Sequence, residues 1–214
     1  MDRWPHCSYT CYKFCEMWTI FLLFGLSCQS VLSVDYEFRP DDPDIFSDCR
    51  NPPGPPGSTN INGLFNLDEL QLSLNGDMVH FEGNLTTVWD IQPQDRIAIK
   101  GTVMRWDRGV WEPTIFSVST DDFCQVMYDK DQYWYRYWTT HVTNADEVGS
   151  KCLYLKGSKL MHEPFDINLV IYGVNAVSML GRYKIVVTLD AFDDQKKIKR
   201  PTVCVEIKGE MEEL

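Results

Sequence analysis

The sequence predicts an all-β protein: an antiparallel β-sandwich with a short helical insert and an N-terminal signal peptide. Two observations support the sandwich. Short runs of alternating apolar and polar residues recur from residue 64 onward, with turn-forming residues between them, and the chain lacks an internal repeat of the ~20–50 residues typical of solenoids and propellers. The chain has 214 residues, of which 44% are hydrophobic, and this is enough to bury the core of one domain of ordinary size.

The N-terminal segment has the features of a secretory signal. Arg3 and Lys13 precede an apolar run over residues 17–26, and small or polar residues follow up to Ser33. The run is shorter than the ~20 apolar residues that span a bilayer, so we expect no stable membrane span. Residues 1–33 are therefore predicted to be removed, with an uncleaved signal anchor as the alternative.

The chain is acidic, with 20 basic and 31 acidic side chains and a net charge of -11. Removal of residues 1–33 takes away equal numbers of each sign and leaves this balance unchanged. Such a surface repels the phosphates of nucleic acids and anionic lipid head groups, which excludes nucleic acid as a partner. Hydrophobic capture of a lipid remains open.

Cysteine usage points to an oxidising compartment. Four cysteines remain after the predicted cleavage, and an even number in a secreted chain predicts two disulfides, although the spacing alone leaves three pairings open. These residues are Cys49, Cys124, Cys152 and Cys204. Asn84-Leu85-Thr86 is an N-glycosylation sequon, which predicts that Asn84 is glycosylated on the surface of a secreted protein.

Residues 34–60 are rich in proline and glycine, and we expect an extended lead-in there, ahead of a sandwich over residues 61–210. Asn75-Gly76, between runs of alternating leucines, valine and phenylalanine, predicts a β-hairpin. Further strands are predicted at residues 96–106, 110–118, 167–172, 183–189 and 202–207. In the strand over 183–189, the odd-numbered residues are expected to be buried, and Lys184, Thr188 and Asp190 to face solvent.

Residues 120–139 are the predicted helical insert. A short helix beginning at Phe123 would have Phe123, Met127, Trp134 and Trp138 on its apolar side. Residues 133–138 fit a strand equally well, so their conformation stays open.

Motifs of catalysis are absent from the sequence. It contains no nucleophile elbow, phosphate-binding glycine loop, dinucleotide fingerprint or zinc-protease helix. His80, His141 and His162 are isolated from one another at spacings that match no metal motif. We therefore expect a protein that is not an enzyme and that carries no metal and no cofactor.

The C-terminal half contains a series of motifs in a characteristic order. These are Phe123-Cys124, Lys151-Cys152 with Lys156-Gly157, Gly181-Arg182-Tyr183-Lys184-Ile185, and Cys204-Val205-Glu206-Ile207-Lys208-Gly209. The pattern resembles the ML lipid-recognition family, and within it the ganglioside activator branch, which includes many secreted insect proteins. The likeness covers residues 45–210. Leu153 departs from it, since the family often has proline there, and the branch usually carries more cysteines.

The resemblance implies an immunoglobulin-like sandwich whose two sheets part to form an apolar cup. It implies a secreted, non-enzymatic protein that holds a lipid or other hydrophobic small molecule, with a membrane receptor as a candidate partner. It also implies the disulfides Cys49–Cys204 and Cys124–Cys152. The expected lining residues are Trp106, Phe116, Phe165, Ile171, Tyr183 and Ile185, and the insert adds Phe123, Met127, Trp134 and Trp138 as a lip.

An alternative fits the same sequence. Aromatic residues fill the core of every β-sandwich, so the chain is also consistent with an extracellular immunoglobulin-like interaction module that has a filled core and a protein partner.

Overall fold

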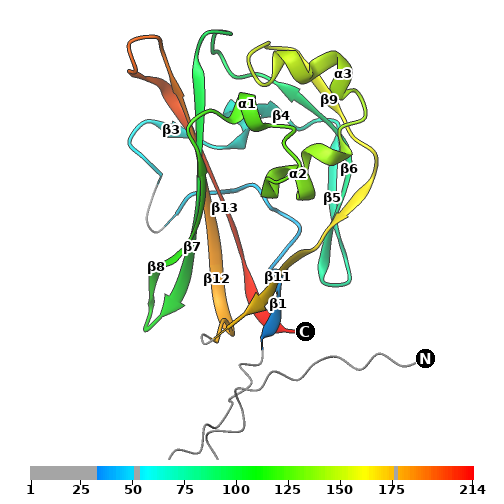
Figure 1. The fold of residues 1–214 in the computed structure, drawn as a ribbon, viewed down its shortest axis with the longest axis vertical. Helices are drawn as coiled ribbons and strands as arrows, with labels where there is room; N and C mark the ends of the chain where they lie inside the picture. Colours follow the sequence, from blue (N-terminus) through cyan, green and yellow to red (C-terminus); the bar gives the residue numbers. More distant parts are fainter. Residues whose placement is uncertain (1–32, 51–53, 176–177) are drawn as a thin grey trace, which may run out of the picture. The chain divides into compact units, whose positions relative to one another are not determined.

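The computed structural model describes residues 33–50, 54–175 and 178–214. The predicted signal peptide, apart from Ser33, lies outside these residues. The described chain is mostly strand, 53% against 12% helical, and its strands form two sheets. The predicted all-β sandwich with a short helical insert is therefore confirmed (Figure 1).

The larger sheet contains the long strands of the C-terminal half. Its order is β11 (Leu169–Val174), β1 (Val34–Pro40), β13 (Ile198–Glu213), β12 (Gly181–Phe192), β7 (Arg96–Asp107) and β8 (Val110–Thr120). All of these pairs are antiparallel. Two short strands, β2 (Ser47–Asp48) and β3 (Ser58–Thr59), also pair with β13. The alternating sequence of each long strand gives the sheet two chemically different faces.

The smaller sheet is built around β6 (Met78–Thr87). Its other strands are β4 (Phe65–Asn66), β5 (Leu70–Asn75), β9 (Lys159–Met161) and β10 (Phe165–Ile167). The hairpin predicted at Asn75-Gly76 is present between β5 and β6, and Gly76 has a φ of 63°, which favours glycine. A 3₁₀ turn, η1 (Ile61–Gly63), precedes β4.

One strand predicted at residues 167–172 is divided between the two sheets. β10 pairs with β6 of the smaller sheet, whereas β11 pairs with β1 of the larger sheet. Only Asn168 separates β10 from β11. The chain therefore passes directly from one layer of the sandwich to the other.

The expected lead-in over residues 34–60 requires correction. Val34–Pro40 form β1, which lies inside the larger sheet between β11 and β13, and β2 and β3 lie further along the same segment. The sequence Val34-Asp35-Tyr36-Glu37-Phe38 alternates as a strand does, and the prolines that follow obscured it.

The insert between β8 and β9 is helical throughout its regular parts. It contains α1 (Phe123–Val126), α2 (Tyr133–Tyr137), η2 (Thr139–His141), α3 (Ala145–Val148) and η3 (Gly149–Lys151). Residues 133–137, for which the sequence left helix and strand open, are thus helix. Within the described parts of the chain, every helix is too short or too polar to cross a membrane.

Candidate binding face between the sheets

Two disulfides close the fold, and their pairing is the one implied by the family resemblance. Cys49 is bonded to Cys204 on β13, and Cys124 in α1 is bonded to Cys152 at the end of the insert. The first closes a long segment of the chain and the second closes only the insert, with sequence separations of 155 and 28 residues. In the chain-entropy model, loops of these lengths contribute about 5 and about 4 kcal/mol.

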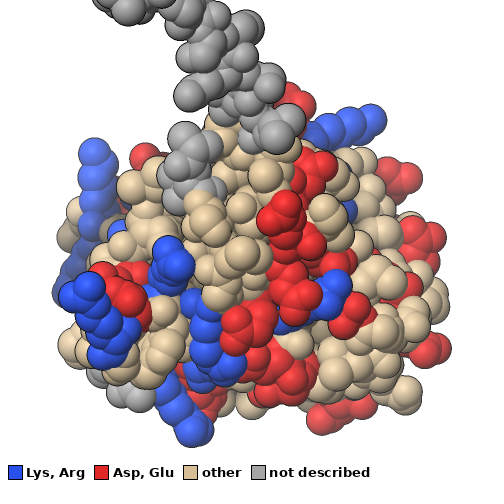
Figure 2. Space-filling view, turned by 90° about the horizontal axis from the view of Figure 1, so that it is seen from below, with Lys and Arg blue, Asp and Glu red and all other residues tan. Residues whose placement is uncertain are grey.

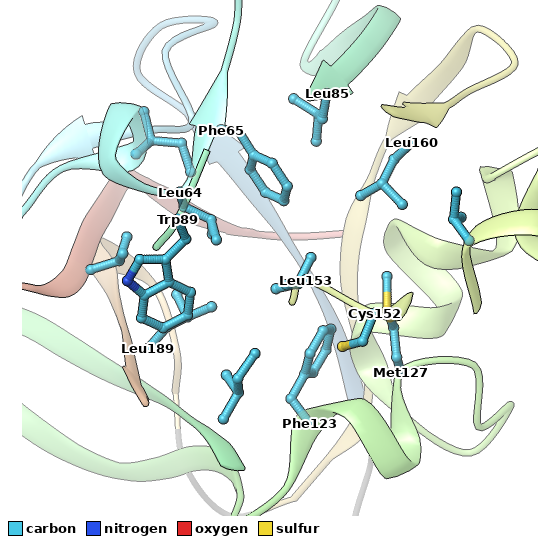
Figure 3. Close-up of a cluster of buried hydrophobic side chains, with 14 of the residues drawn as sticks. Leu64, Phe65, Leu85, Trp89, Phe123, Met127, Cys152, Leu153, Leu160 and Leu189 are labelled. Carbon is cyan, nitrogen blue, oxygen red and sulfur yellow. The ribbon is translucent and has the colours of Figure 1, made fainter. Parts of the chain in front are cut away.

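The apolar side chains between the sheets form two clusters that differ in how completely they are buried. The first cluster combines residues of both sheets and the insert, including Phe81, Leu85, Phe123, Leu153 and Leu189. In Figure 3 the side chains of Leu85, Phe123, Leu153 and Leu189 point toward a common centre. Phe123 and Leu153 are completely inaccessible to solvent, so the centre of this cluster is closed, and thirteen partly buried apolar side chains surround it.

The insert packs its aromatic residues onto the first cluster. The ring of Phe123 is stacked on that of Trp138 at 6.1 Å and meets Trp134 edge-on at 5.4 Å. Indole Nε1 of Trp134 donates to the Val126 carbonyl oxygen at 2.9 Å. The two indoles are only partly buried, so they lie at the margin of the first cluster.

The second cluster belongs to the opposite half of the larger sheet. Its buried members are Tyr36, Phe38, Met179, Tyr183 and Met211. Eight further apolar side chains pack against them but stay partly exposed: Val34, Val103, Phe116, Leu169, Ile171, Val174, Ile185 and Ile207. This half of the sandwich is therefore only partly closed.

Strand register shows which face these residues occupy. Leu189 lies in the first cluster and so faces the smaller sheet, and alternation along β12 places Val187 and Ile185 on the same inner face. β12 is a central strand, with β7 on one side and β13 on the other. Because its edges are covered, solvent reaches the half-buried Ile185 and Val187 only from the space in front of the sheet.

The predicted lining residues are divided between the two clusters. Phe123, Met127 and Phe165 are buried in the first cluster, with Trp134 and Trp138 at its margin. Tyr183, Phe116, Ile171 and Ile185 belong to the second cluster, where Tyr183 is buried and the other three are half-buried.

Trp106 has a different position. Its strand neighbour Arg105 is in register with Tyr183 and shares the inner face, so alternation turns Trp106 to the outer face. There it meets Trp111 edge-on at 5.0 Å and remains 42% exposed. Trp106 thus does not line the space between the sheets, because strand register, which the sequence does not specify, decides its direction.

The outer face of the larger sheet holds a buried ion pair that the sequence analysis missed. Lys184 was expected to face solvent, yet its side chain is fully buried and its ammonium lies 2.8 Å from Glu206. The ammonium also donates to the Arg50 carbonyl oxygen at 2.7 Å and lies over the Trp111 ring. Burial alone would raise the pKa of Glu206, but hydrogen bonds from Lys184 and Lys208 keep this pKa below its usual value.

The structure brings together two histidines that looked isolated in the sequence. His141 is stacked on Phe165 at 4.0 Å, and His162 lies 6.4 Å from the same ring. Nε2 of His162 accepts a hydrogen bond from Trp138 Nε1 at 3.0 Å. Burial lowers the pKa of His162 to about 4, and the charge of His141 acts in the same direction. His162 is thus a neutral acceptor that joins the insert to the smaller sheet.

Two hollows open on the surface of the described residues. One, of about 280 Å³, is lined by Arg105, Asp107, Glu112, Pro113 and Thr114. The other, of about 380 Å³, is lined by Asp44, Phe46, Ser47, Asp48, Arg50, Asn60, Ile61, Asn62, Leu67 and Lys208. In the described ranges no group of three or more histidine, cysteine or carboxylate side chains is arranged to hold a metal ion.

These features define the class of the protein as a two-sheet β-sandwich with two disulfides, a helical insert and an inner face that is closed at one half and half-open at the other. Comparison of the sequence with models of known families and with curated proteins gives no match.

Proposed function

We propose that the protein is a secreted, non-enzymatic binding protein that holds a lipid or another hydrophobic small molecule against the second cluster. The proposal includes membership of the ML lipid-recognition family. The observation that carries it is the partial exposure of Ile185 and Ile207, apolar side chains of the second cluster on the inner face of central strands. A guest that covers them gains about 25 cal/mol for each Å² of apolar surface removed from water.

Two further observations support this function. The disulfides and the absence of a membrane-spanning helix among the described residues fit an extracellular protein. Asn84, the predicted glycosylation site, lies on β6 of the smaller sheet. Its Nδ2 donates to the Glu69 carboxylate at 2.9 Å in an exposed position. A glycan there would lie on the surface of the sandwich, away from the second cluster, because Asn84 alternates with the buried Leu85 of the first cluster.

A second candidate is an extracellular interaction module whose partner is another protein, such as a membrane receptor. The closed first cluster favours it, because Phe123, Met127 and Leu153 are packed as in an ordinary core. The two functions differ in what the second cluster does. A module has no requirement for a guest there.

The test uses full-length protein secreted from a eukaryotic host. Native mass spectrometry before and after delipidation, followed by titration with a fluorescent fatty acid and a fluorescent sterol, measures the guest directly. Ile185→Trp would fill the inner face and should weaken binding about tenfold or more, whereas Ile115→Trp, at a side chain that is 88% exposed, is the matched control.

Binding that is equal in wild type and Ile185→Trp would contradict the proposed location. Wild-type protein that carries no lipid and binds neither probe would favour the interaction module. If Ile185→Trp does not fold, Ile207→Phe tests the same face from β13.

A further inference from the structure

Arg105 lies at the border of the second cluster. Its guanidinium carbon is 5.8 Å from the centre of the Tyr183 ring, and Nη2 donates to the backbone oxygen of Leu180 at 3.2 Å. Arg105 and Tyr183 are register partners on β7 and β12. The charge of Arg105 thus lies over the inner face, beside the apolar side chains that the proposed guest would cover.

Two other arginines of the same sheet, Arg182 and Arg39, are neutralised by carboxylates. On the outer face, Arg182 is bonded to Glu210 at 3.3 Å and to Asp41, and Arg39 lies 2.7 Å from Glu212. Figure 2 shows basic and acidic side chains side by side on the lower surface of the molecule. Arg105 is different, since no carboxylate oxygen of the described residues lies within 4.0 Å of its guanidinium.

Arg105 nevertheless has acidic neighbours in the hollow of about 280 Å³. Glu112 on β8 is its register partner, and both side chains line this hollow without forming an ion pair. Asp107, which also lines it, is 3.9 Å from the exposed Arg108. Thr114 has no proton left to donate to a phosphate, because its hydroxyl donates to the Val103 carbonyl oxygen; it also accepts from the Phe116 amide. The hollow therefore presents one cation, Arg105, and two carboxylates, Glu112 and Asp107, neither of which forms an ion pair with Arg105.

We propose that this hollow binds the head group of a zwitterionic amphiphile, such as a phosphocholine or phosphoethanolamine lipid. The phosphate would lie on Arg105 and the ammonium on Glu112, while the acyl chain covers Val103, Phe116 and Ile185. This proposal rests on the proposed function, since the chain needs the second cluster. Arginine binds phosphate through parallel hydrogen bonds, and a carboxylate complements a neighbouring ammonium.

Head groups of other charge fit the hollow less well. A simple anion on Arg105 would face Glu112 and Asp107, and a simple cation would face Arg105. A neutral head group would cover both charges without replacing their water, which is costly for ionised groups. The hollow therefore selects for a head group that carries both signs.

The test compares four probes that each carry one hydrocarbon chain of the same length: lysophosphatidylcholine, lysophosphatidic acid, monoacylglycerol and the alkyl trimethylammonium ion. Binding is measured by native mass spectrometry and by calorimetry on the delipidated full chain. We expect lysophosphatidylcholine to bind about tenfold more tightly than each of the others. Arg105→Gln and Glu112→Gln should each remove this preference.

Lys100→Gln is the matched control, because Lys100 lies on the same strand as Arg105 but on the outer face, where its register partner is Thr188. It should keep the preference intact. Circular dichroism and the unfolding midpoint of each variant establish that it is folded. A second readout is a double-mutant cycle, in which Arg105→Gln and Glu112→Gln together should lose little more than either change alone.

The outcomes separate the two proposals. If none of the four probes binds the wild type, the proposed function itself fails. If all four bind equally, the guest site stands and the head-group inference is overturned. Tightest binding of lysophosphatidic acid, strengthened by Glu112→Gln, would also overturn it, because the hollow would then recognise an anion alone.

Discussion

The two apolar clusters of this sandwich are made of similar residues but differ in the space in front of them. In the first, which the smaller sheet and the disulfide-closed insert cover, twenty buried residues outnumber thirteen partly buried ones, whereas in the second eight partly buried residues outnumber five buried ones. β12 contributes to both, so a single strand runs from a sealed core at Leu189 to a half-open face at Ile185. The difference teaches that one apolar face can be sealed at one end and accessible at the other, and under the proposed function the accessible end is the one that binds.

Phe123→Ala should have the largest effect on stability. The residue is fully buried and in contact with two indoles, so its removal leaves a cavity and should cost about 3–5 kcal/mol in the free energy of unfolding. Urea denaturation followed by tryptophan fluorescence measures this. A loss below 1 kcal/mol would mean that the first cluster is not a closed core.

Acidification should weaken the first cluster through His162. Its pKa is lowered to about 4 by burial, so between pH 6.5 and 4 the unfolded chain binds more protons than the folded one, and stability falls as the pH falls. The expected contribution is about 3 kcal/mol. In His162→Gln, the difference in unfolding free energy between pH 7 and pH 4 should be smaller by this amount. The glutamine side chain does not titrate, but its amide oxygen can still accept the hydrogen bond from Trp138. Equal pH dependence in the variant and the wild type would contradict this role.

The sharpest comparison uses two positions on β12. Leu189→Ala should cost about 2–4 kcal/mol and leave guest affinity unchanged, since Leu189 is only 6% exposed. Ile185→Ala should cost about 1–2 kcal/mol, because the side chain is already partly solvated, and should weaken binding of a fluorescent fatty acid. Equal losses of stability at both positions would erase the distinction between the clusters.

Trp106→Ser should have the smallest effect. The residue is exposed on the outer face, so we expect about 1 kcal/mol or less from the lost contact with Trp111 and no change in guest affinity. Fluorescent titration of this variant beside Ile185→Ala provides the check. A drop in affinity for Trp106→Ser would place the guest on the other side of the sheet.

The sequence predicted the strands well where alternation and turn residues agreed. The hairpin at Asn75-Gly76 and the long strands β7, β8 and β12 are where the pattern placed them. Strand β1 was missed because the pattern is short and is followed by prolines. The disulfide pairing came from the family resemblance, since spacing alone left the choice open.

The candidate site was harder to predict, because it depends on register and on contacts distant in the sequence. Alternation assigned Tyr183 and Ile185 to one face but could not decide that Trp106 turns the other way. Lys184 was placed in solvent by its polarity, and only the segment that follows β2, together with Glu206, reveals that it is covered. The sequence likewise does not predict that Arg105 and Glu112 are register partners that form no ion pair.

The passage of the chain through Asn168 limits how far the two sheets can move apart at that point. β10 and β11 are separated by this residue alone, so the chain joins the two sheets there by a connection of one residue. This is the shortest of the connections between the two sheets, since the other strands that follow one another in different sheets are joined by longer segments. Glycines inserted between β10 and β11 would lengthen this connection. Under the proposed function, they should speed both the association and the dissociation of the guest.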